Sequence, residues 1–230
     1  MQSVQKMYPL PEPCPDQPAL KRIGNTVRKR IANDPSVYRF QTTKAEIYAV
    51  GDFIAPRECD NLIRRIDAVA QPSVTYGHNY SGTYRTSYSG NFDKDDPVVK
   101  TVERRIDDLL GLPYEIGERV QGQRYLPGQQ FKPHFDWFHP TDETCWPIER
   151  GRGGQRSWTA MAFLNDVDEG GDTEFTHARM AVTPKRGALL FWNNADMNGY
   201  PNEDTMHAGT PVIAGVKYVI TKWYRVRRWG

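Results

Sequence analysis

The second half of the chain constrains the fold most, because after Pro113 it consists of short strand-like runs separated by turns. Runs such as ERVQGQRYL, FKPHFDWF and SWTAMAFLN contain many strand-forming residues, and Gly, Pro, Asn or Asp lies between them. About seven or eight such runs, without helices between them, are typical of a β-sandwich or barrel rather than of βαβ units. We therefore expect a β-rich core over about residues 113–230.

Two amphipathic helices are expected before this core. Pro56 suits the first turn of one, and apolar residues follow it at helical spacing. Asp96 can cap the other, which is expected to begin at Pro97 and to end at Gly111. Helices first and strands afterwards predict a mainly β fold with flanking helices. Its core would be a jelly roll, or double-stranded β-helix, supported by N-terminal α-helices outside one sheet.

The N-terminal segment differs in character from the rest. Five prolines lie within residues 1–20, so an extended leader is expected there. Residues 21–32 could form a short basic helix. The simplest division is an N-terminal arm over residues 1–35 and one main domain over 36–230, with helical support at about 45–112 and the jelly roll at about 113–230.

Composition excludes several classes of protein. No apolar run approaches the roughly 20 residues that cross a bilayer, and the N-terminus lacks a signal-peptide segment. The three cysteines lack CxxC spacing, which argues against a disulfide framework or a structural zinc site. The charges nearly balance, with a net +2. We expect a cytoplasmic monomer or homodimer with neither a membrane nor a nucleic-acid partner.

A His-x-Asp pair, His134 and Asp136, lies within FKPHFDWF. In a strand, residues two apart point to the same face, so both side chains would face one cavity. The pair alone is weak, since chance supplies one in about a third of chains of this composition. His207 opens the later run HAGTPVIAGVK. Two imidazoles and a carboxylate form the facial triad of non-haem Fe(II) oxygenases. A zinc site uses similar ligands, although no HExxH is present.

Lys217 lies in the strand-like run GVKYVITKW, among apolar neighbours. A buried lysine needs a partner, and it could neutralise the far carboxylate of a bound dianion. A solvated strand lysine is the alternative, and the pattern by itself does not decide between them.

Together these features resemble the prolyl 4-hydroxylase family of 2-oxoglutarate dioxygenases. The shared motifs occur in order over about residues 84–224: YLPGQQFKPHFDWF, GGQRSWTAMAFLNDVDEGGDTEF, PKRGALLFWN and HAGTPVIAGVKYVITKW. The resemblance implies Fe(II), the cosubstrates 2-oxoglutarate and O₂, and ascorbate as reductant. It also implies hydroxylation of a peptidyl proline to 4-hydroxyproline, with succinate and CO₂ as co-products.

The resemblance assigns roles to individual residues. The family's iron ligands match His134, Asp136 and His207, and its cosubstrate-binding residues match Lys217, Tyr125 and Thr173.

Further matches concern the substrate. Arg156 and Trp223 match positions that contact a peptide or wall the site, and Arg85 belongs to TYRTSYSGNF, which resembles a mobile substrate-covering loop. Phe131 departs from the family, because many members have a substrate-holding Tyr there. Tyr218 replaces the Trp that commonly follows the lysine.

Three alternatives stay open. The same chemistry could act on a free amino acid or another small molecule, and a closed pocket with a second carboxylate clamp would favour this. A non-catalytic jelly-roll binding module would form no succinate. A zinc enzyme would keep its activity when 2-oxoglutarate is withheld.

Overall fold

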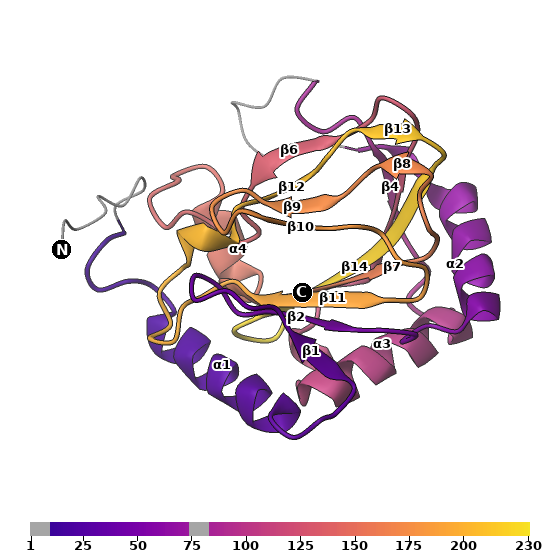
Figure 1. The fold of residues 1–230 in the computed structure, drawn as a ribbon. Helices are drawn as coiled ribbons and strands as arrows, with labels where there is room; N and C mark the ends of the chain where they lie inside the picture. The colour runs from indigo at the N-terminus through magenta and orange to yellow at the C-terminus, as the bar shows by residue number, and fades with distance from the viewer. Residues whose placement is uncertain (1–9, 74–82) are drawn as a thin grey trace.

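A computed structural model describes residues 10–73 and 83–230, and two antiparallel sheets that face each other form its centre (Figure 1). The larger sheet has the strand order β1 (Val37–Arg39), β2 (Ile47–Val50), β11 (Leu189–Asn193), β7 (Arg156–Phe163), β14 (Lys217–Arg225), β5 (Gln121–Tyr125), β4 (Tyr88–Asn91) and β3 (Gln71–Pro72). The smaller sheet has the order β10 (Met180–Val182), β9 (Thr173–Phe175), β12 (His207–Gly209) and β6 (Phe131–His134). A short pair joins β13 (Val212–Ala214) to β8 (Glu169–Gly170). The predicted double-stranded β-helix is confirmed.

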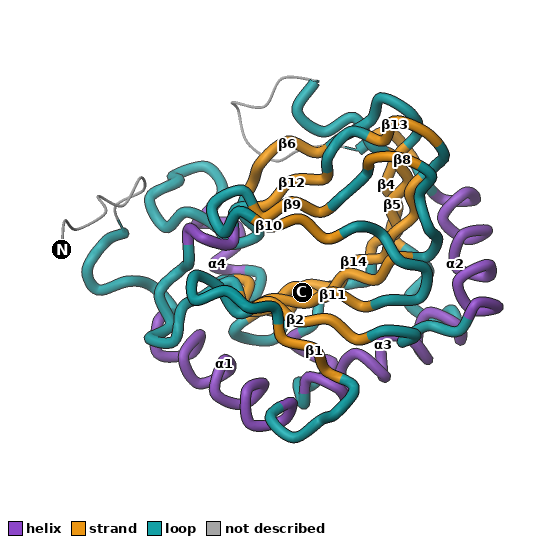
Figure 2. Tube along the Cα trace, viewed as in Figure 1, coloured by secondary structure: helices purple, strands orange, loops and turns teal. Residues whose placement is uncertain are grey.

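Three long helices lie outside the larger sheet, as Figure 2 shows in purple. They are α1 (Gln17–Ile31), α2 (Pro56–Val69) and α3 (Pro97–Leu110). The predicted start and end of α3 are both observed. The Asp96 carboxylate accepts hydrogen bonds from the first-turn amides, and Gly111 ends the helix with a φ of 65°. The remaining helices are short: α4 (Trp146–Gly151), η1 (Tyr114–Ile116) and η2 (Glu203–Thr205).

Helix α1 begins earlier than expected. It starts at Gln17, so the prediction of an extended leader through residue 20 is wrong for its last residues. Pro18 occupies the first turn, where a missing amide hydrogen leaves no bond unmade. Leu20 and Val27 of this helix belong to the main core. The boundary at residue 35 stays a prediction. No helix in residues 10–73 or 83–230 is long and apolar enough to span a membrane.

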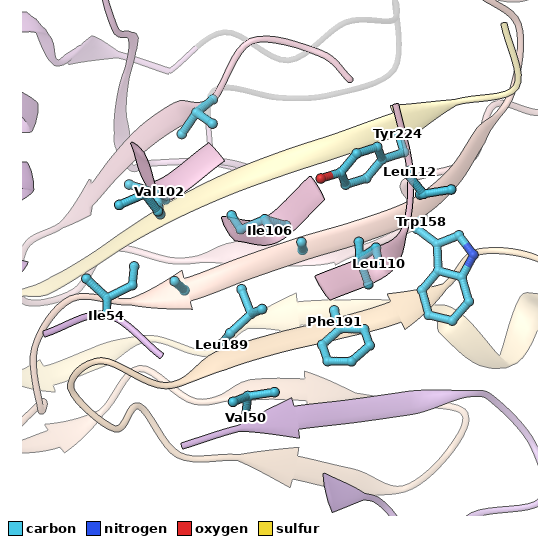
Figure 3. Close-up of a cluster of buried hydrophobic side chains, with 14 of the residues drawn as sticks. Val50, Ile54, Val102, Ile106, Leu110, Leu112, Trp158, Leu189, Phe191 and Tyr224 are labelled. Atoms are coloured by element: carbon cyan, nitrogen blue, oxygen red, sulfur yellow. The ribbon is translucent and has the colours of Figure 1, made fainter. Parts of the chain in front are cut away.

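The core has two apolar layers. The first fills the space between the helices and the larger sheet, and it includes Val102 and Ile106 of α3 together with Trp158, Phe191 and Tyr224 of the sheet (Figure 3). The second lies between the two sheets and includes Phe163, Phe175, Trp192 and Val219. Trp192 and Val219 of this second layer also line a cavity between the sheets.

Strand β14 separates these two layers. Its residues Ile220 and Tyr224 belong to the helix-side core, whereas Lys217, Val219, Thr221 and Trp223 line a cavity between the sheets. This is the alternation of a strand with both faces covered. Every second residue of β14 from Lys217 to Trp223 is therefore directed to the cavity.

Candidate metal centre and cosubstrate cavity

The candidate metal centre lies where β6 and β12 pair. His134 ends β6, His207 begins β12, and the two are directly opposite in the ladder. Their ring centroids are 4.3 Å apart. Asp136 is buried beside them, with its Oδ2 3.7 Å from Nε2 of His207. One potential ligand atom from each of the three residues lies within 4.8 Å of the others.

Asp136 reaches this cluster in a different way from that expected. The predicted alternation would place it in the same strand as His134, but β6 ends at His134 and Asp136 lies beyond the ladder. Its carboxylate is held instead by Thr159 of β7, whose hydroxyl donates to Oδ2 at 2.7 Å. A tertiary contact therefore orients this carboxylate.

In both imidazoles, Nδ1 forms a hydrogen bond to a backbone carbonyl oxygen. Nδ1 of His134 lies 2.8 Å from the Lys132 carbonyl oxygen, and Nδ1 of His207 lies 3.0 Å from that of Thr205. A carbonyl oxygen can only accept, so each Nδ1 carries a hydrogen, which leaves Nε2 as the ring nitrogen available to a metal. Burial, with the neighbouring His207, lowers the pKa of His134 to about 3. It is therefore a neutral imidazole at pH 7, as a metal ligand must be.

The third group supplies a negative charge. Burial alone would raise the pKa of Asp136, but His207, His134, Arg156 and the Thr159 hydrogen bond together hold it below its ordinary value. An ionised carboxylate with two imidazoles suits a divalent metal such as Fe(II), and this donor set also suits Zn(II). The residues present therefore fit a metal ion.

Lys217 is a buried cation without a carboxylate partner. It is 3% exposed, and its Nζ has one weak hydrogen bond, to Thr173 Oγ1 at 3.5 Å. The rings of Tyr125 and Phe163 lie 5.5 and 5.6 Å away. Every Asp and Glu of the chain lies within the described residues, and none forms an ion pair with Lys217. Burial lowers its pKa to about 7, although the charge of Asp172, which forms no ion pair with it, acts in the opposite direction. Such a group fits an incoming anion.

The cavity joins these two features. All the residues singled out from the sequence except Arg156 line it: His134, Asp136, His207, Lys217, Tyr125, Thr173, Phe131, Trp223 and Arg85. The Tyr125 hydroxyl donates to Gln123 Oε1 at 2.9 Å. The metal cluster and the unpaired lysine therefore belong to one site.

Phe131 and Arg85 form one edge of the cluster. The Phe131 ring stacks on the His134 imidazole, with centroids 3.5 Å apart and planes at 15°. The Arg85 guanidinium lies 4.8 Å from the Phe131 ring and donates to Ser87 and Gln121. The Phe131 ring thus contacts both the His134 imidazole and the Arg85 guanidinium.

Arg156 lies outside this lining. Its Nε and Nη2 donate to the two carboxylate oxygens of Glu118, at 2.6 and 2.8 Å. Its guanidinium lies 4.2 Å from the Trp223 ring. Glu118 also binds Arg225, which in turn pairs with Glu149. This network of two arginines and two glutamates supports the wall that carries Trp223.

Several lining residues were missed in the sequence. Val219 and Thr221 could have been found, because they share the alternation of Lys217 and Trp223 along β14. Gln123 could have been found as well, because it shares the alternation of Tyr125 along β5. Thr159 carried no such signal, since it comes from β7 and enters the site through strand register.

Comparisons with known proteins agree with this geometry. Residues 120–225 match the sequence model of the 2OG-Fe(II) oxygenase superfamily. Prolyl 4-hydroxylase 5 of Arabidopsis thaliana is 35% identical over 206 residues, which cover 76% of this chain and 66% of that protein. Prolyl 4-hydroxylase 1 of the same plant is 32% identical over 232 residues, which cover 90% and 74%. The chain spans roughly two thirds to three quarters of the length of these relatives.

A solved structure is similar as well. It is a viral collagen prolyl hydroxylase from Paramecium bursaria Chlorella virus-1 in a 2OG complex, with a TM-score of 0.62 and 26% identity. The alignment covers 78% of this chain and 95% of the viral one. By sequence and by fold, this chain belongs to the prolyl 4-hydroxylases, within the 2OG-Fe(II) oxygenase superfamily.

Proposed function

We propose that the protein is an Fe(II)- and 2-oxoglutarate-dependent dioxygenase that converts peptidyl proline to 4-hydroxyproline. One observation carries the proposal. The cavity between the sheets is lined both by the His134, Asp136 and His207 cluster and by Lys217, a buried cation without a carboxylate partner. A metal site alone would suit many reactions, whereas the lysine adds a receptor for an anionic cosubstrate.

The three clustered residues would hold Fe(II) through Nε2 of each histidine and the Asp136 carboxylate. With 2-oxoglutarate and O₂, the metal supplies an oxidative decarboxylation to succinate and CO₂ that inserts one oxygen atom into a substrate C–H bond. The protein's own contribution is to keep the His134 imidazole neutral and the Asp136 carboxylate ionised, and to exclude water from a buried site. Three protein ligands would leave coordination positions of such a metal open to the cosubstrate.

Lys217 would bind the carboxylate of 2-oxoglutarate that lies away from the metal. Thr173, 3.5 Å from its ammonium group, adds a hydroxyl to the same corner. The Tyr125 hydroxyl would exchange its bond to Gln123 for one to the cosubstrate. Charge-assisted hydrogen bonds of this kind are about twice as strong as neutral ones.

The substrate would lie on the side of Phe131 and Trp223. A peptidyl proline has an apolar ring and no amide hydrogen, so a cavity wall that includes the aromatic side chains of Phe131 and Trp223 suits it. Arg85 would cover the substrate, and Arg156 would act through the Trp223 ring that it supports. A polypeptide substrate agrees with the name of the viral collagen prolyl hydroxylase.

A direct assay tests the proposal. Purified protein with Fe(II), 2-oxoglutarate and ascorbate is incubated with proline-rich peptides or with free proline, and products are analysed by mass spectrometry. We expect peptide proline to gain one oxygen atom and an equal amount of succinate to form. His134→Ala should abolish both, because it removes one ligand. His177→Ala is the matched control, since His177 bonds the Glu203 carbonyl outside the cavity lining.

Each contrary outcome identifies an alternative. Oxygen gained by free proline and by no peptide would support the small-molecule substrate. Turnover that persists without 2-oxoglutarate would support a zinc enzyme. Absence of succinate with every substrate, together with unchanged metal binding in His134→Ala, would support a non-catalytic binding module.

Three further proposals accompany this function. Ascorbate would serve as the reductant that returns the metal to Fe(II). The enzyme would act in the cytoplasm, as a monomer or homodimer. Fractionation and sedimentation test the location and the oligomeric state.

A further inference from the structure

A chain of three hydrogen bonds ends on Asp136. Trp192 Nε1 donates to Asn194 Oδ1 at 3.1 Å, Asn194 Nδ2 donates to Thr159 Oγ1 at 2.9 Å, and Thr159 Oγ1 donates to Asp136 Oδ2 at 2.7 Å. Trp192, Asn194 and Thr159 are each at most 1% exposed. Bulk water therefore does not compete for these bonds. We call these three residues the Trp192 relay.

The relay has one possible direction. An indole nitrogen can only donate, so the carbonyl oxygen of Asn194 must face Trp192 and its amide nitrogen must face Thr159. The Thr159 hydroxyl accepts from Asn194 and has its own hydrogen left for Asp136. Each group thus sets the orientation of the next, and hydrogen bonds aligned in one direction strengthen one another.

Regular strands hold the relay in place. Trp192 of β11 is directly opposite Thr159 of β7. The backbone N–H of Asn194 donates to the Ser157 carbonyl oxygen at 2.8 Å. The Trp192 ring also packs against His207, with centroids 4.8 Å apart and planes at 65°. The residue that starts the relay therefore contacts a second member of the cluster.

We propose that Thr159, Asn194 and Trp192 are positioning residues that fix the rotation of the Asp136 carboxylate for metal binding. The inference rests on the proposed function, because it takes Asp136 as a ligand. Asp136 lies beyond the end of β6, so no ladder of its own orients it. Without the relay, its carboxylate would sample several orientations, and metal binding would have to restrict them.

Metal binding by Thr159 variants tests the relay without requiring turnover. Co(II) is titrated into the metal-free protein, and its d–d absorption reports both affinity and ligand geometry. Thr159→Val keeps the shape but removes the hydroxyl, so we expect the Kd for Co(II) to rise about 10-fold to 100-fold, with an altered spectrum. Thr159→Ser should restore both. Ser157→Ala is the matched control, because it removes a buried hydroxyl of the same strand that donates to the Tyr224 carbonyl.

A second variant breaks the relay at its start. Trp192→Phe keeps an aromatic ring against His207 but loses the indole hydrogen, so we expect a smaller rise in the Kd, about 3-fold. In the double variant with Thr159→Val, the Phe substitution should add nothing, since the bond that transmits its effect is already absent. Strictly additive effects would overturn the relay.

The outcomes separate this inference from the proposed function. A wild-type protein that does not bind Co(II) would overturn the metal assignment itself. Wild-type binding with an unchanged Kd and spectrum in Thr159→Val would overturn the relay alone. If Thr159→Val does not fold, an unchanged Kd in Trp192→Phe overturns the relay, and a raised Kd supports it.

Discussion

The two faces of β14 each bury a lysine, and the two lysines differ in what surrounds them. Lys222, on the helix side, is 1% exposed, and its Nζ lies 2.7 Å from Asp107 and 3.4 Å from Glu103 of α3. Lys217, on the cavity side, is 3% exposed and has no carboxylate partner. The two lysines, five positions apart on one strand, are therefore similarly buried, but only Lys222 forms ion pairs with carboxylates.

The difference indicates what each lysine is for. A buried charge is tolerated when it is paired, and breaking a buried pair is strongly destabilising. The fold itself supplies the partners of Lys222, so we interpret that group as structural. The fold supplies none for Lys217, so a ligand is expected to complete it. The four predictions below test this contrast, from the largest expected effect to the smallest.

Lys222→Met should destabilise the protein most. It leaves Glu103 and Asp107 buried without their cation, so we expect the free energy of unfolding to fall by about 3–5 kcal/mol in urea denaturation. Arg104→Met is the control, because Arg104 pairs with Asp108 on the exposed surface of α3 and should change little. Loss of 2-oxoglutarate affinity in folded Lys222→Met, comparable to that of a Lys217 variant, would contradict the separation of the two faces.

Lys217→Met should affect the cosubstrate rather than the fold. We expect the Kd for 2-oxoglutarate to rise about 100-fold, which corresponds to the loss of a charge-assisted hydrogen bond in a buried site. The free energy of unfolding should stay the same or rise, since an unpaired buried charge is removed. Calorimetry and urea denaturation measure the two effects. Lys185→Met, at an exposed lysine, is the control. A large loss of stability in Lys217→Met would show that a structural partner exists.

The pH dependence should distinguish the lysines further. The pKa of Lys217 is lowered from 10.5 to about 7 by burial. Between these values the unfolded chain holds the proton and the folded chain does not, so the free energy of unfolding rises with pH over this range. In Lys217→Met, we expect this contribution to be absent. When 2-oxoglutarate binds to the metal-loaded protein near about pH 8, nearly one proton should be taken up by the wild type and none by the variant. Equal uptake in both would contradict the prediction.

Glu103→Gln should give the smallest effect. Burial raises the pKa of Glu103 above 4.5 despite the nearby Lys222. Its folded state therefore holds a proton more tightly than its unfolded state, and its contribution to the free energy of unfolding falls as pH rises above 4.5. In the variant, this decline of the free energy of unfolding with pH should be absent. At pH 7 its free energy of unfolding should differ from that of the wild type by less than about 1 kcal/mol, because Lys222 keeps its closer bond to Asp107. Urea denaturation across the pH range measures it, and a loss as large as that of Lys222→Met would show that Glu103 is the principal partner.

Much of the architecture could be predicted because its signals are local. Pro97 and Asp96 mark the start of α3 and Gly111 its end, through the backbone preferences of those residues. The start of α1 is earlier than the sequence predicts, because the prolines of residues 1–20 favour an extended leader, although Pro18 suits a first helical turn.

The residue types of the functional site could be predicted from the sequence, but not all of its geometry. His134, Asp136, His207 and Lys217 were found from residue type, order and resemblance, and the structure brings them to one cavity. The alternation expected for Asp136 does not place it, because its strand ends at His134. Gln123 shares the alternation of Tyr125 along β5, whereas Thr159 carried no signal, since strand register brings it there.

By itself, the sequence determined the classes of element, the caps of α3 and the residue types able to hold a metal and an anion, because these follow from short-range preferences and side-chain chemistry. Only the tertiary structure decided that His134 lies opposite His207, that Thr159 reaches Asp136, and that Lys222 has carboxylates where Lys217 has none. These contacts join residues far apart in the chain, and their geometry depends on how strands and helices pack rather than on their neighbours in sequence.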